Sequence, residues 1–585
     1  MLIPFLLTLI TTSLGLLLVL LLFWTAWRHR NPPADVVAPP PVTKASGPTA
    51  TNPWIRGLRI GFLVLLIAVF GFHSYWVFKA DSTDEFTRSK RLDARNRRLA
   101  ESGLKGWVLD RSGKLENALI RYRNDAGTIS REYPLGEAAV HLTGYSDFVF
   151  GAGGFEYAFR QWLTEPESSL NRATSSGLVG KDLKVSIDSK LQREAFELLF
   201  RAGKPAAAIV LLLPNNEVLA MASTPSFDPR NVTDESTWRR MSQQAETAQD
   251  LSPLVNRALG TLVSGGPAFY YRPGSTFKTF TAAAAIDAGV SGEIFTCRAE
   301  GFTPPGSGRS IRDYGGEVHG SIGLADAFKH SCNQYFAQLG LKVGRLRLAD
   351  YAKRLHFSVS PDDQAPNSLE LWHIEHADPR SFSSIFAAPQ QKMNLSSTAS
   401  QYDIALQSIG QGFDDVSVIQ MALIASAVGS SDGAYVAPTF ELGGKRKIIG
   451  QFISAQSAAQ VRGLMRLVVQ SGTASGAFAS LDRGLTAGGK TGTADREVTS
   501  YDREGNPIVL TDADGRQHTK HNGVTDSWFI GFAPANNPRI AYAVMVENGG
   551  QGAHSAAPIA VKLIETAAAL GYFGDATEAD RSRRN

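Results

Sequence analysis

Hydrophobic positions concentrate at the N-terminal end of this chain. Residues 2–27 form an apolar run without a charged residue, and residues 58–78 form a second run that ends in aromatic side chains. A helix needs about 20 apolar residues to cross the hydrocarbon core of a membrane, so both runs are long enough. The first run lacks a basic start and a small-residue cleavage site, which disfavours a cleaved signal peptide. We therefore predict two transmembrane helices, over residues 1–27 and 58–78.

The composition changes between and after these two runs. Residues 28–57 contain two proline clusters among many Ala, Ser and Thr residues, which is typical of a flexible Pro/Ala-rich linker. A charged stretch follows the second run, and residues 106–113 then read as a short strand that ends in a turn. We predict that residues 79–182 form a stalk and a small α+β pedestal module.

Strand-like patterns return in the remaining part of the chain. Apolar runs cover residues 206–213 and 217–222 on either side of a turn, and residues 527–532 and 540–546 near the C-terminus. The sequence between them is mostly helical in pattern, and an Ala-rich helix is expected over 557–570. Strands at both ends of a helical middle favour one antiparallel sheet with helices on its faces. We predict a large α+β domain over 183–575 and a disordered tail over 576–585.

Composition and charge exclude some classes of function. The 585 residues are too many for a single core, and a net charge of +4 gives no reason to expect a nucleic-acid partner. The 11 histidines and two cysteines include no H-x-x-x-H or C-x-x-C pattern, so we expect no metal site and no cofactor. We expect Cys297 and Cys332 to be packed free thiols, although an oxidising compartment would permit a disulfide between them.

The candidate chemistry begins with Ser275-Thr276-Phe277-Lys278. Pro-Gly precedes this motif and an Ala-rich stretch follows it, so Ser275 should stand at the start of a helix. Residues i and i+3 share a helix face, which puts Lys278 about one turn from the serine hydroxyl. A serine nucleophile needs such a base, and a lysine can serve when burial or a second cation lowers its pKa. The alternative is that Ser275 only caps the helix.

Two later motifs supply further polar groups. Ser331-Cys332-Asn333 falls between two helical stretches, and such a junction can point two polar side chains into a cleft; helix capping is the alternative. Lys490-Thr491-Gly492-Thr493 follows two glycines and predicts a strand whose lysine and hydroxyls suit a substrate carboxylate. The backbone of that strand can also pair with an extended peptide. A plain exposed turn with a surface lysine is the alternative here.

Each of these motifs is weak evidence when taken alone. Ser-x-x-Lys occurs a second time at Ser102–Lys105, and Ser-x-Asn occurs a second time at Ser169–Asn171. Lys-Thr-Gly occurs once, and both copies of the other two motifs precede it. The combination predicts an active-site serine acyltransferase that works on the carboxyl end of a peptide. In it, Lys490 is expected to help lower the pKa of Lys278.

The three motifs together resemble those of the penicillin-recognising serine acyltransferases, and the surrounding sequence is similar to that of class B penicillin-binding proteins, the monofunctional peptidoglycan transpeptidases. The similar stretches run from about residue 183 to residue 570. They are residues 218–229, 256–258, 272–279, 409–412, 528–534 and 546–550, and residues 106–113 look like a degraded form of the family's opening motif.

The resemblance implies a serine acyl-enzyme mechanism. Ser275 would attack the carbonyl of the penultimate D-Ala of a stem peptide while Lys278 takes its proton. Ser331 would relay a proton to the leaving amine, and Asn333 would hold the substrate amide and orient Lys278. Lys490 would adjust the electrostatics around Ser331. β-Lactam antibiotics would acylate Ser275 by the same attack.

The resemblance also implies how substrate binds. Thr491 and Thr493 would bind the terminal carboxylate, and Gly492 belongs to the same substrate-binding strand. The backbone N–H groups of Ser275 and Thr493 would form the oxyanion hole, in which loss of one donor costs about 3 kcal/mol of transition-state stabilisation.

The resemblance further implies a fold, a location and partners. The fold expected is a five-stranded antiparallel sheet flanked by helices. The charged, turn-rich insert over 495–524 is a feature of this chain itself, and we predict that it forms a mobile hairpin beside the cleft. The protein would sit in the cytoplasmic membrane with residues from about 79 onward outside, in the periplasm. Its partner would be a polytopic lipid-II polymerase of the shape-elongation-division-sporulation family. The pedestal is too short for a glycosyltransferase domain.

Two other functions remain open from the residues alone. A D,D-carboxypeptidase or a β-lactamase uses the same acylating residues but resolves the acyl-enzyme with water. A non-catalytic β-lactam sensor or scaffold of the cell-wall machinery is a different class, which the complete set of motif residues disfavours.

Overall fold

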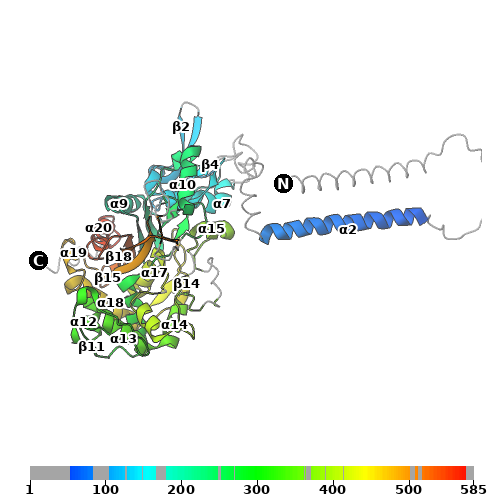
Figure 1. Cartoon of the computed structure of the whole chain (residues 1–585). Helices are drawn as coiled ribbons and strands as arrows, with labels where there is room; N and C mark the ends of the chain where they lie inside the picture. Colours follow the sequence, from blue (N-terminus) through cyan, green and yellow to red (C-terminus); the bar gives the residue numbers. More distant parts are fainter. Residues whose placement is uncertain are drawn as a thin grey trace, which may run out of the picture. The chain divides into compact units, whose positions relative to one another are not determined.

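A computed structural model describes residues 53–82, 105–125, 128–147, 149–165, 180–247, 252–268, 270–360, 363, 371–388, 391–412, 414–500, 508–511 and 517–574. The chain divides into two compact units, residues 1–96 and residues 97–585. The elements are labelled in Figure 1.

The first unit contains one described helix, α2 (Pro53–Ser82). It covers the second apolar run, so the helix predicted there forms. Within the described ranges, however, no helix is both long and apolar enough to cross a membrane. The structure therefore does not confirm a membrane span over residues 58–78. The predicted span over 1–27 and the predicted tail over 576–585 lie outside the described residues.

The second unit begins with a small sheet and three short helices. The sheet has the strand order β3 (Thr128–Glu132), β2 (Ala118–Asp125), β1 (Val108–Leu109) and β6 (Leu183–Lys184). Strand β6 pairs with β1 in parallel, so the sheet contains residues on both sides of the predicted boundary at 182/183. The helices are α5 (Val140–Thr143), α6 (Gly154–Ala158) and α7 (Arg160–Thr164).

A buried carboxylate organises this region. Glu156 is fully buried and accepts hydrogen bonds from Arg131 Nε at 2.6 Å and Lys105 Nζ at 3.2 Å. Burial alone would raise the pKa of Glu156, but the two cations outweigh it and lower the pKa to about 2. Lys105 is the lysine of the other Ser-x-x-Lys motif, Ser102–Lys105. In that motif the lysine therefore pairs with buried Glu156.

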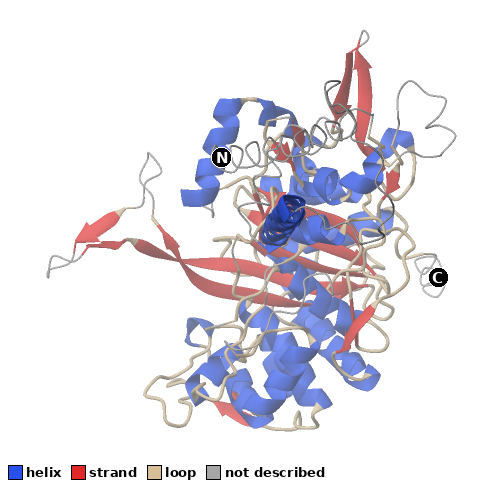
Figure 2. Ribbon diagram, turned by 90° about the vertical axis from the view of Figure 1, so that its right-hand side faces the viewer, coloured by secondary structure: helices blue, strands red, loops and turns tan. Residues whose placement is uncertain are grey.

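The predicted antiparallel sheet lies at the centre of the unit. Its order is β15 (Gly488–Thr499), β18 (His521–Ala533), β19 (Ile540–Val546), β7 (Ala206–Leu212) and β8 (Glu217–Thr224), and every neighbouring pair is antiparallel. These strands include the four runs that the sequence predicted. Figure 2 shows the sheet running across the unit with helices packed against it. The α+β fold with a five-stranded sheet is confirmed.

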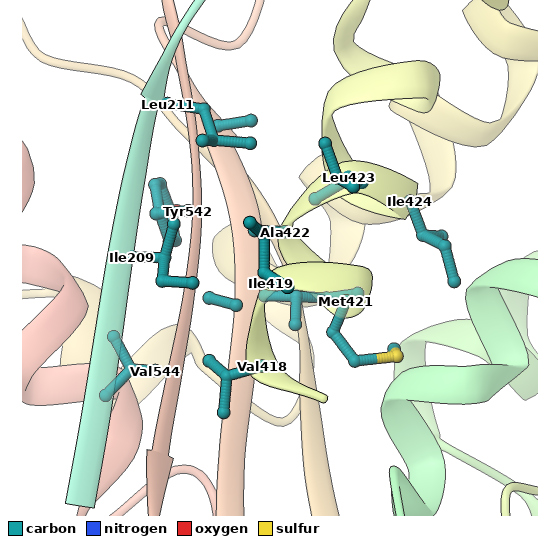
Figure 3. Close-up of a cluster of buried hydrophobic side chains, with 14 of the residues drawn as sticks. Ile209, Leu211, Val418, Ile419, Met421, Ala422, Leu423, Ile424, Tyr542 and Val544 are labelled. Atoms are coloured by element: carbon teal, nitrogen blue, oxygen red, sulfur yellow. The ribbon is translucent and has the colours of Figure 1, made fainter. Parts of the chain in front are cut away.

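Helices cover both faces because the sheet is apolar on both. Every residue of β19 and of α17 (Val418–Gly429) is buried. Helix α17 packs on one face, where Val418, Ile419 and Ala422 meet strand residues such as Ile209 and Val544 (Figure 3). Helices α9 (Ser189–Arg201) and α20 (Ala556–Ala569) pack against each other and against the strands of the other face.

The helical middle of the unit carries two of the three motifs. Its main helices are α11 (Lys278–Asp287), α12 (Leu324–His330), α13 (Asn333–Val343), α14 (Arg345–Arg354), α15 (Pro379–Phe386), α16 (Gln401–Gln407) and α18 (Ala455–Ser471). The shorter or peripheral elements are η1 (Leu115–Asn117), η2 (Gly136–Ala138), β4 (Ser146–Asp147), β5 (Gly151–Ala152), η3 (Pro229–Thr233), α10 (Glu235–Thr247), β9 (Val255–Asn256), β10 (Thr261–Leu262), η5 (Gly274–Phe277), β11 (Phe295–Cys297), η6 (Tyr314–Gly316), β12 (Gly320–Ile322), β13 (Ala434–Val436), β14 (Ile448–Gln451), α19 (Ser475–Phe478), β16 (Val509–Thr511) and β17 (Gln517–Thr519).

Strands β15 and β18 continue past the sheet as a long hairpin. Their pairing runs from Gly488↔Phe532 out to Thr499↔His521. Figure 2 shows the two strands projecting beyond the rest of the sheet. At the base of the projection, Arg496 Nε donates to Asp526 Oδ2 at 2.6 Å. The described residues of 495–524 pair as a hairpin, as predicted; the rest of that segment lies outside the described residues.

Candidate active site

Ser275 lies in the 3₁₀ turn η5, directly before helix α11, as the sequence predicted. The preceding Gly274 has φ +53°, and a Cβ at this position would lie 2.4 Å from the carbonyl oxygen of Thr493. Glycine is therefore required there, and it brings the nucleophile turn against strand β15. Ser275 is half-buried, and its Oγ makes no hydrogen bond to the residues that the structure describes. The hydroxyl is open to a ligand.

Lys278 occupies the first turn of α11 and is fully buried. Its Nζ donates to the carbonyl oxygen of Ser331 at 2.6 Å, to Ser331 Oγ at 3.2 Å and to Asn333 Oδ1 at 2.6 Å. An ammonium group has three donors, so these contacts use all of them. Neutral Lys278 has only two N–H donors, so it must give up one of these bonds before its lone pair can accept a proton from Ser275.

Ser331 stands at the predicted helix junction, between α12 and α13. Its backbone is left-handed, with φ 60° and ψ 38°, a conformation that costs a non-glycine residue about 1–3 kcal/mol. The side-chain oxygen accepts from Lys278 Nζ and, at 2.9 Å, from Lys490 Nζ. Both lone pairs of the hydroxyl are then used, and its proton remains free to be donated into the cleft.

Asn333 begins helix α13 and is fixed at both ends of its amide. Oδ1 accepts from Lys278, and Nδ2 donates to the carbonyl oxygen of Arg312 at 3.0 Å. The amide of Asn333 is therefore fixed in orientation, and its Oδ1 holds the ammonium group of Lys278 in place. This arrangement matches the orienting role that the resemblance implies for Asn333.

Lys490 and its neighbours form part of β15, which is an edge strand of the central sheet. Alternation along the strand puts Thr491 and Thr493 on the same face. Thr491 Oγ1 lies 2.7 Å from Thr473 Oγ1. Thr493 is half-buried, and its hydroxyl has no hydrogen-bond partner within the described ranges. The free edge of β15 and the Thr493 hydroxyl are both available to a peptide end.

The two lysines have lowered pKa values. Burial lowers the pKa of Lys278 to about 8, against the opposing effects of Cys332 and Asp313. Burial and the nearby Lys278 cation lower the pKa of Lys490 well below its usual value. The sequence predicted that Lys490 would push down the pKa of Lys278. Burial is the largest cause at both lysines, and the repulsion between the two cations adds to it at Lys490.

Two residues at the site were missed by the sequence analysis. Asp313 is buried, accepts from the backbone N–H of Asn333, and accepts from Gln334 Nε2 at 2.9 Å. It therefore anchors the start of α13. Thr473 follows helix α18 and meets Thr491. Neither residue lies in a motif, so no local pattern identifies them.

The second copies of the motifs do not contribute to this site. Lys105 is paired with Glu156, as described above, and Ser102, Ser169 and Asn171 lie outside the described residues. The structure brings the three predicted motifs together from η5–α11, the α12–α13 junction and β15. Two buried cations meet at the Ser331 hydroxyl, and the nucleophile turn with Ser275 directly precedes Lys278, an arrangement suited to acyl transfer.

The chain matches known proteins over most of its length. The family described as "Penicillin binding protein transpeptidase domain" matches residues 206–565. The "Peptidoglycan D,D-transpeptidase PbpA" of Mycolicibacterium smegmatis is 26% identical over 547 residues, which cover 87% of this chain and 97% of that protein. The "Peptidoglycan D,D-transpeptidase MrdA" of Haemophilus influenzae is 27% identical over 441 residues, which cover 72% of this chain and 61% of that protein.

Solved structures have the same fold. The crystal structure of PBPA from Mycobacterium tuberculosis is 24% identical, with a TM-score of 0.61, and the match covers 80% of this chain and 100% of that one. The family match extends over more than half of this chain, which agrees with the resemblance seen in the sequence. The chain therefore belongs to the penicillin-binding protein transpeptidase family, as one of its class B members.

Proposed function

We propose that this chain is a peptidoglycan D,D-transpeptidase that cross-links stem peptides through an acyl-enzyme on Ser275. The observation that carries the proposal is the shared hydroxyl of Ser331, on which the buried ammonium groups of Lys278 and Lys490 converge. The names of the two relatives above support the same activity. A β-lactam would acylate the same serine, as a penicillin G acyl-enzyme complex of penicillin-binding protein A from M. tuberculosis suggests.

Acylation follows from the positions of these groups. Neutral Lys278 takes the proton of Ser275 as Oγ attacks the carbonyl carbon of the penultimate D-Ala. The backbone N–H groups of Ser275 and Thr493 receive the oxyanion, since Gly274 holds the two segments in contact. The carbon–nitrogen bond then breaks, the leaving amine takes the proton of Ser331, and Ser331 regains a proton from protonated Lys278, which is then neutral again. Lys490 stabilises the Ser331 oxygen during that transfer.

Substrate binding uses the edge of the sheet. An extended peptide can add to β15 through backbone hydrogen bonds. Its terminal carboxylate would lie at the Thr491 and Thr493 hydroxyls, beside Gly492, with the buried cations behind them. The acceptor amine of a second stem peptide then attacks the ester, forms the amide cross-link and releases Ser275. If water attacks instead, the product is that of a D,D-carboxypeptidase.

The decisive experiment is labelling of the full chain with a fluorescent penicillin. Wild type should be labelled covalently, Ser275→Ala should not be, and Ser480→Ala should be labelled like wild type because Ser480 is exposed. Correctly folded wild type that is not labelled would refute the proposal. Incubation of donor pentapeptide with an amine acceptor then separates transfer from hydrolysis, because only transfer yields a product that contains the acceptor.

The proposal extends to location and partners. Its stem-peptide substrates lie outside the cytoplasmic membrane, so residues from about 79 onward are proposed to work there, in the periplasm of a bacterium with two membranes. The growing glycan would come from a polytopic lipid-II polymerase of the shape-elongation-division-sporulation family. A reporter enzyme that is active only outside the cytoplasm, fused after Asn585, tests the location. Cross-linking in cells followed by mass spectrometry tests the partner.

A further inference from the structure

The carboxylate of Glu547 collects hydrogen bonds from three separate segments of the chain. Glu547 follows the last residue of β19 and is buried. Its Oε1 accepts from Tyr271 Oη at 2.8 Å and from Arg257 Nε at 2.8 Å, and its Oε2 accepts from Arg496 Nη2 at 2.8 Å. Tyr271 and Arg257 are buried as well. A buried carboxylate needs such donors around it, so the three segments are held to one point.

Two of the three donors belong to the segments that carry the proposed oxyanion hole. Tyr271 precedes the turn with Ser275, and Arg496 follows Thr493 on strand β15. The path from the Tyr271 hydroxyl through Glu547 to the Arg496 guanidinium therefore joins the nucleophile turn to β15. It is a connection through side chains, in addition to the backbone contact at residue 274 described above.

Tyr271 is held at its backbone and at its ring. Its N–H donates to the carbonyl oxygen of Val416, and its carbonyl oxygen accepts from the N–H of Val416, both at 2.9 Å. Its ring meets the indole of Trp528 edge to face, with 6.0 Å between the ring centroids. The hydroxyl bond to Glu547 therefore acts on a residue that is already fixed, so little motion is lost when it forms.

Arg496 is held on its other side by a second carboxylate. Its Nε donates to Asp526 Oδ2 at 2.6 Å, and Asp526 Oδ1 accepts from the backbone N–H of Asn548 at 2.9 Å. The planar guanidinium thus bridges Asp526 and Glu547 in one fixed orientation. Because Asn548 is the next residue after Glu547, both ends of this bridge return to the end of β19.

We propose that Glu547 is a positioning residue for acyl transfer, with Tyr271 and Arg496 as its two arms. It holds the nucleophile turn and β15 at the separation at which the backbone N–H groups of Ser275 and Thr493 can receive one oxyanion. The reaction concerned is the one proposed above, so this inference rests on the proposed function. Donors placed for charge that develops in the transition state act on the chemical step. Loss of either arm should therefore slow acylation without weakening the initial binding of ligand.

The first test is Tyr271→Phe, which removes the hydroxyl and keeps the ring against Trp528. Stopped-flow kinetics with a penicillin separates the dissociation constant of the initial complex from the rate constant of acylation. We expect the rate constant to fall about 10-fold and the dissociation constant to stay at its wild-type value. The matched control is Tyr435→Phe. Tyr435 is also buried, and its hydroxyl donates to Gln420 Oε1 at 2.9 Å, so this variant loses an equivalent bond outside the network and should acylate like wild type.

The second test breaks the other arm. Arg496→Gln leaves Glu547 with Arg257 as its cation and should also slow acylation about 10-fold. Its control is Arg446→Gln, because Arg446 donates to Asp432 at 2.7 and 2.9 Å outside the network.

A double variant tests whether the two arms form one link. Tyr271→Phe combined with Arg496→Gln should acylate no more slowly than the slower single variant. Effects that multiply in the double variant would overturn the proposal, as would wild-type acylation in either single variant. Each single variant tests the link by itself, so the answer does not depend on both of them folding.

Hydrogen exchange of the unliganded chain, followed by mass spectrometry, gives a readout that needs no acylation. Tyr271→Phe should speed exchange in residues 493–499, and Arg496→Gln should speed it in residues 271–278, whereas neither control should do so. If exchange responds in this way but no penicillin labels folded wild type, the link stands and the proposed function fails. If wild type is labelled and Tyr271→Phe is acylated at the wild-type rate, the proposed function stands and the positioning role fails.

Discussion

Gly410 lies directly against Gly274. The backbone N–H of Gly274 donates to the carbonyl oxygen of Gly410 at 3.0 Å, and a Cβ at Gly410 would lie 1.9 Å from the carbonyl oxygen of Gly274. Gly410 belongs to the stretch over 409–412 that resembles the family. The turn that carries Ser275 is therefore held from both sides, by residue 410 and by the backbone of Thr493.

The first prediction follows from this contact. Gly410→Ala should displace the nucleophile turn and slow penicillin acylation roughly 10- to 100-fold, because small misplacements of a reacting group have effects of that size. Gly289→Ala is the control, because its φ is also positive at +70° but a Cβ there meets nothing within 4 Å. Stopped-flow acylation and thermal unfolding should be measured on both variants. Equal acylation rates in the two would show that the contact is unimportant.

The second prediction concerns pH. Burial lowers the pKa of Lys278 to about 8, so below that pH the lysine is protonated and cannot accept the proton of Ser275. The rate of acylation should rise with pH, with an apparent pKa about 8, and level off above it. The measurement is the second-order rate constant with a non-titrating β-lactam between pH 6 and 10, on protein shown to stay folded. A profile that is flat or falls over this range would contradict the assignment of Lys278 as base.

The third prediction separates the two properties of Ser331. Ser331→Ala and Ser331→Gly both remove the hydroxyl shared by the two lysines, so both should lose most of their acylation activity. Glycine adopts the left-handed backbone without strain, and Ser331→Gly should be more stable than Ser331→Ala by about 1 kcal/mol. Denaturant unfolding measures the difference. Equal stability of the two variants would mean that the backbone of residue 331 relaxes when the hydroxyl is absent.

The fourth prediction concerns the region outside the site. Glu156→Gln leaves Arg131 and Lys105 without their buried carboxylate, which should destabilise the protein by about 3–5 kcal/mol. The matched control, Glu116→Gln, changes an exposed residue and should have little effect. The folded fraction of Glu156→Gln should still react with penicillin. If Glu156→Gln lost its reactivity with penicillin but not its stability, the ion pairs of Glu156 would be linked to the active site.

Acid should produce a related effect. The pKa of Glu156 is lowered from 4.5 to about 2 in the folded protein. Its contribution to stability is then complete above about pH 4.5 and decreases as the pH falls toward 2. The difference in melting temperature between wild type and Glu156→Gln should therefore shrink over this window. If the difference in melting temperature did not change with pH, the ionised carboxylate of Glu156 would not be the source of the stability difference.

The sequence predicted the parts of the site that depend on local pattern. Ser275 at a helix start, the junction around Ser331 and the strand of Lys490 all follow from short-range signals, and the structure agrees with each. Asp313, Thr473 and Gly410 were not identified as contacts, because their roles arise only when distant segments pack together.

The order of strands in the central sheet has a consequence for the synthesis of the protein. Strand β19 lies between β18 and β7, so within the sheet the strand that carries Lys490 is joined to the hairpin of β7 and β8 through residues 540–546. A growing chain exposes Ser275 long before it contains that link. Ser275 is therefore made well before strand β15 with Lys490 can be held in the sheet by β18 and β19.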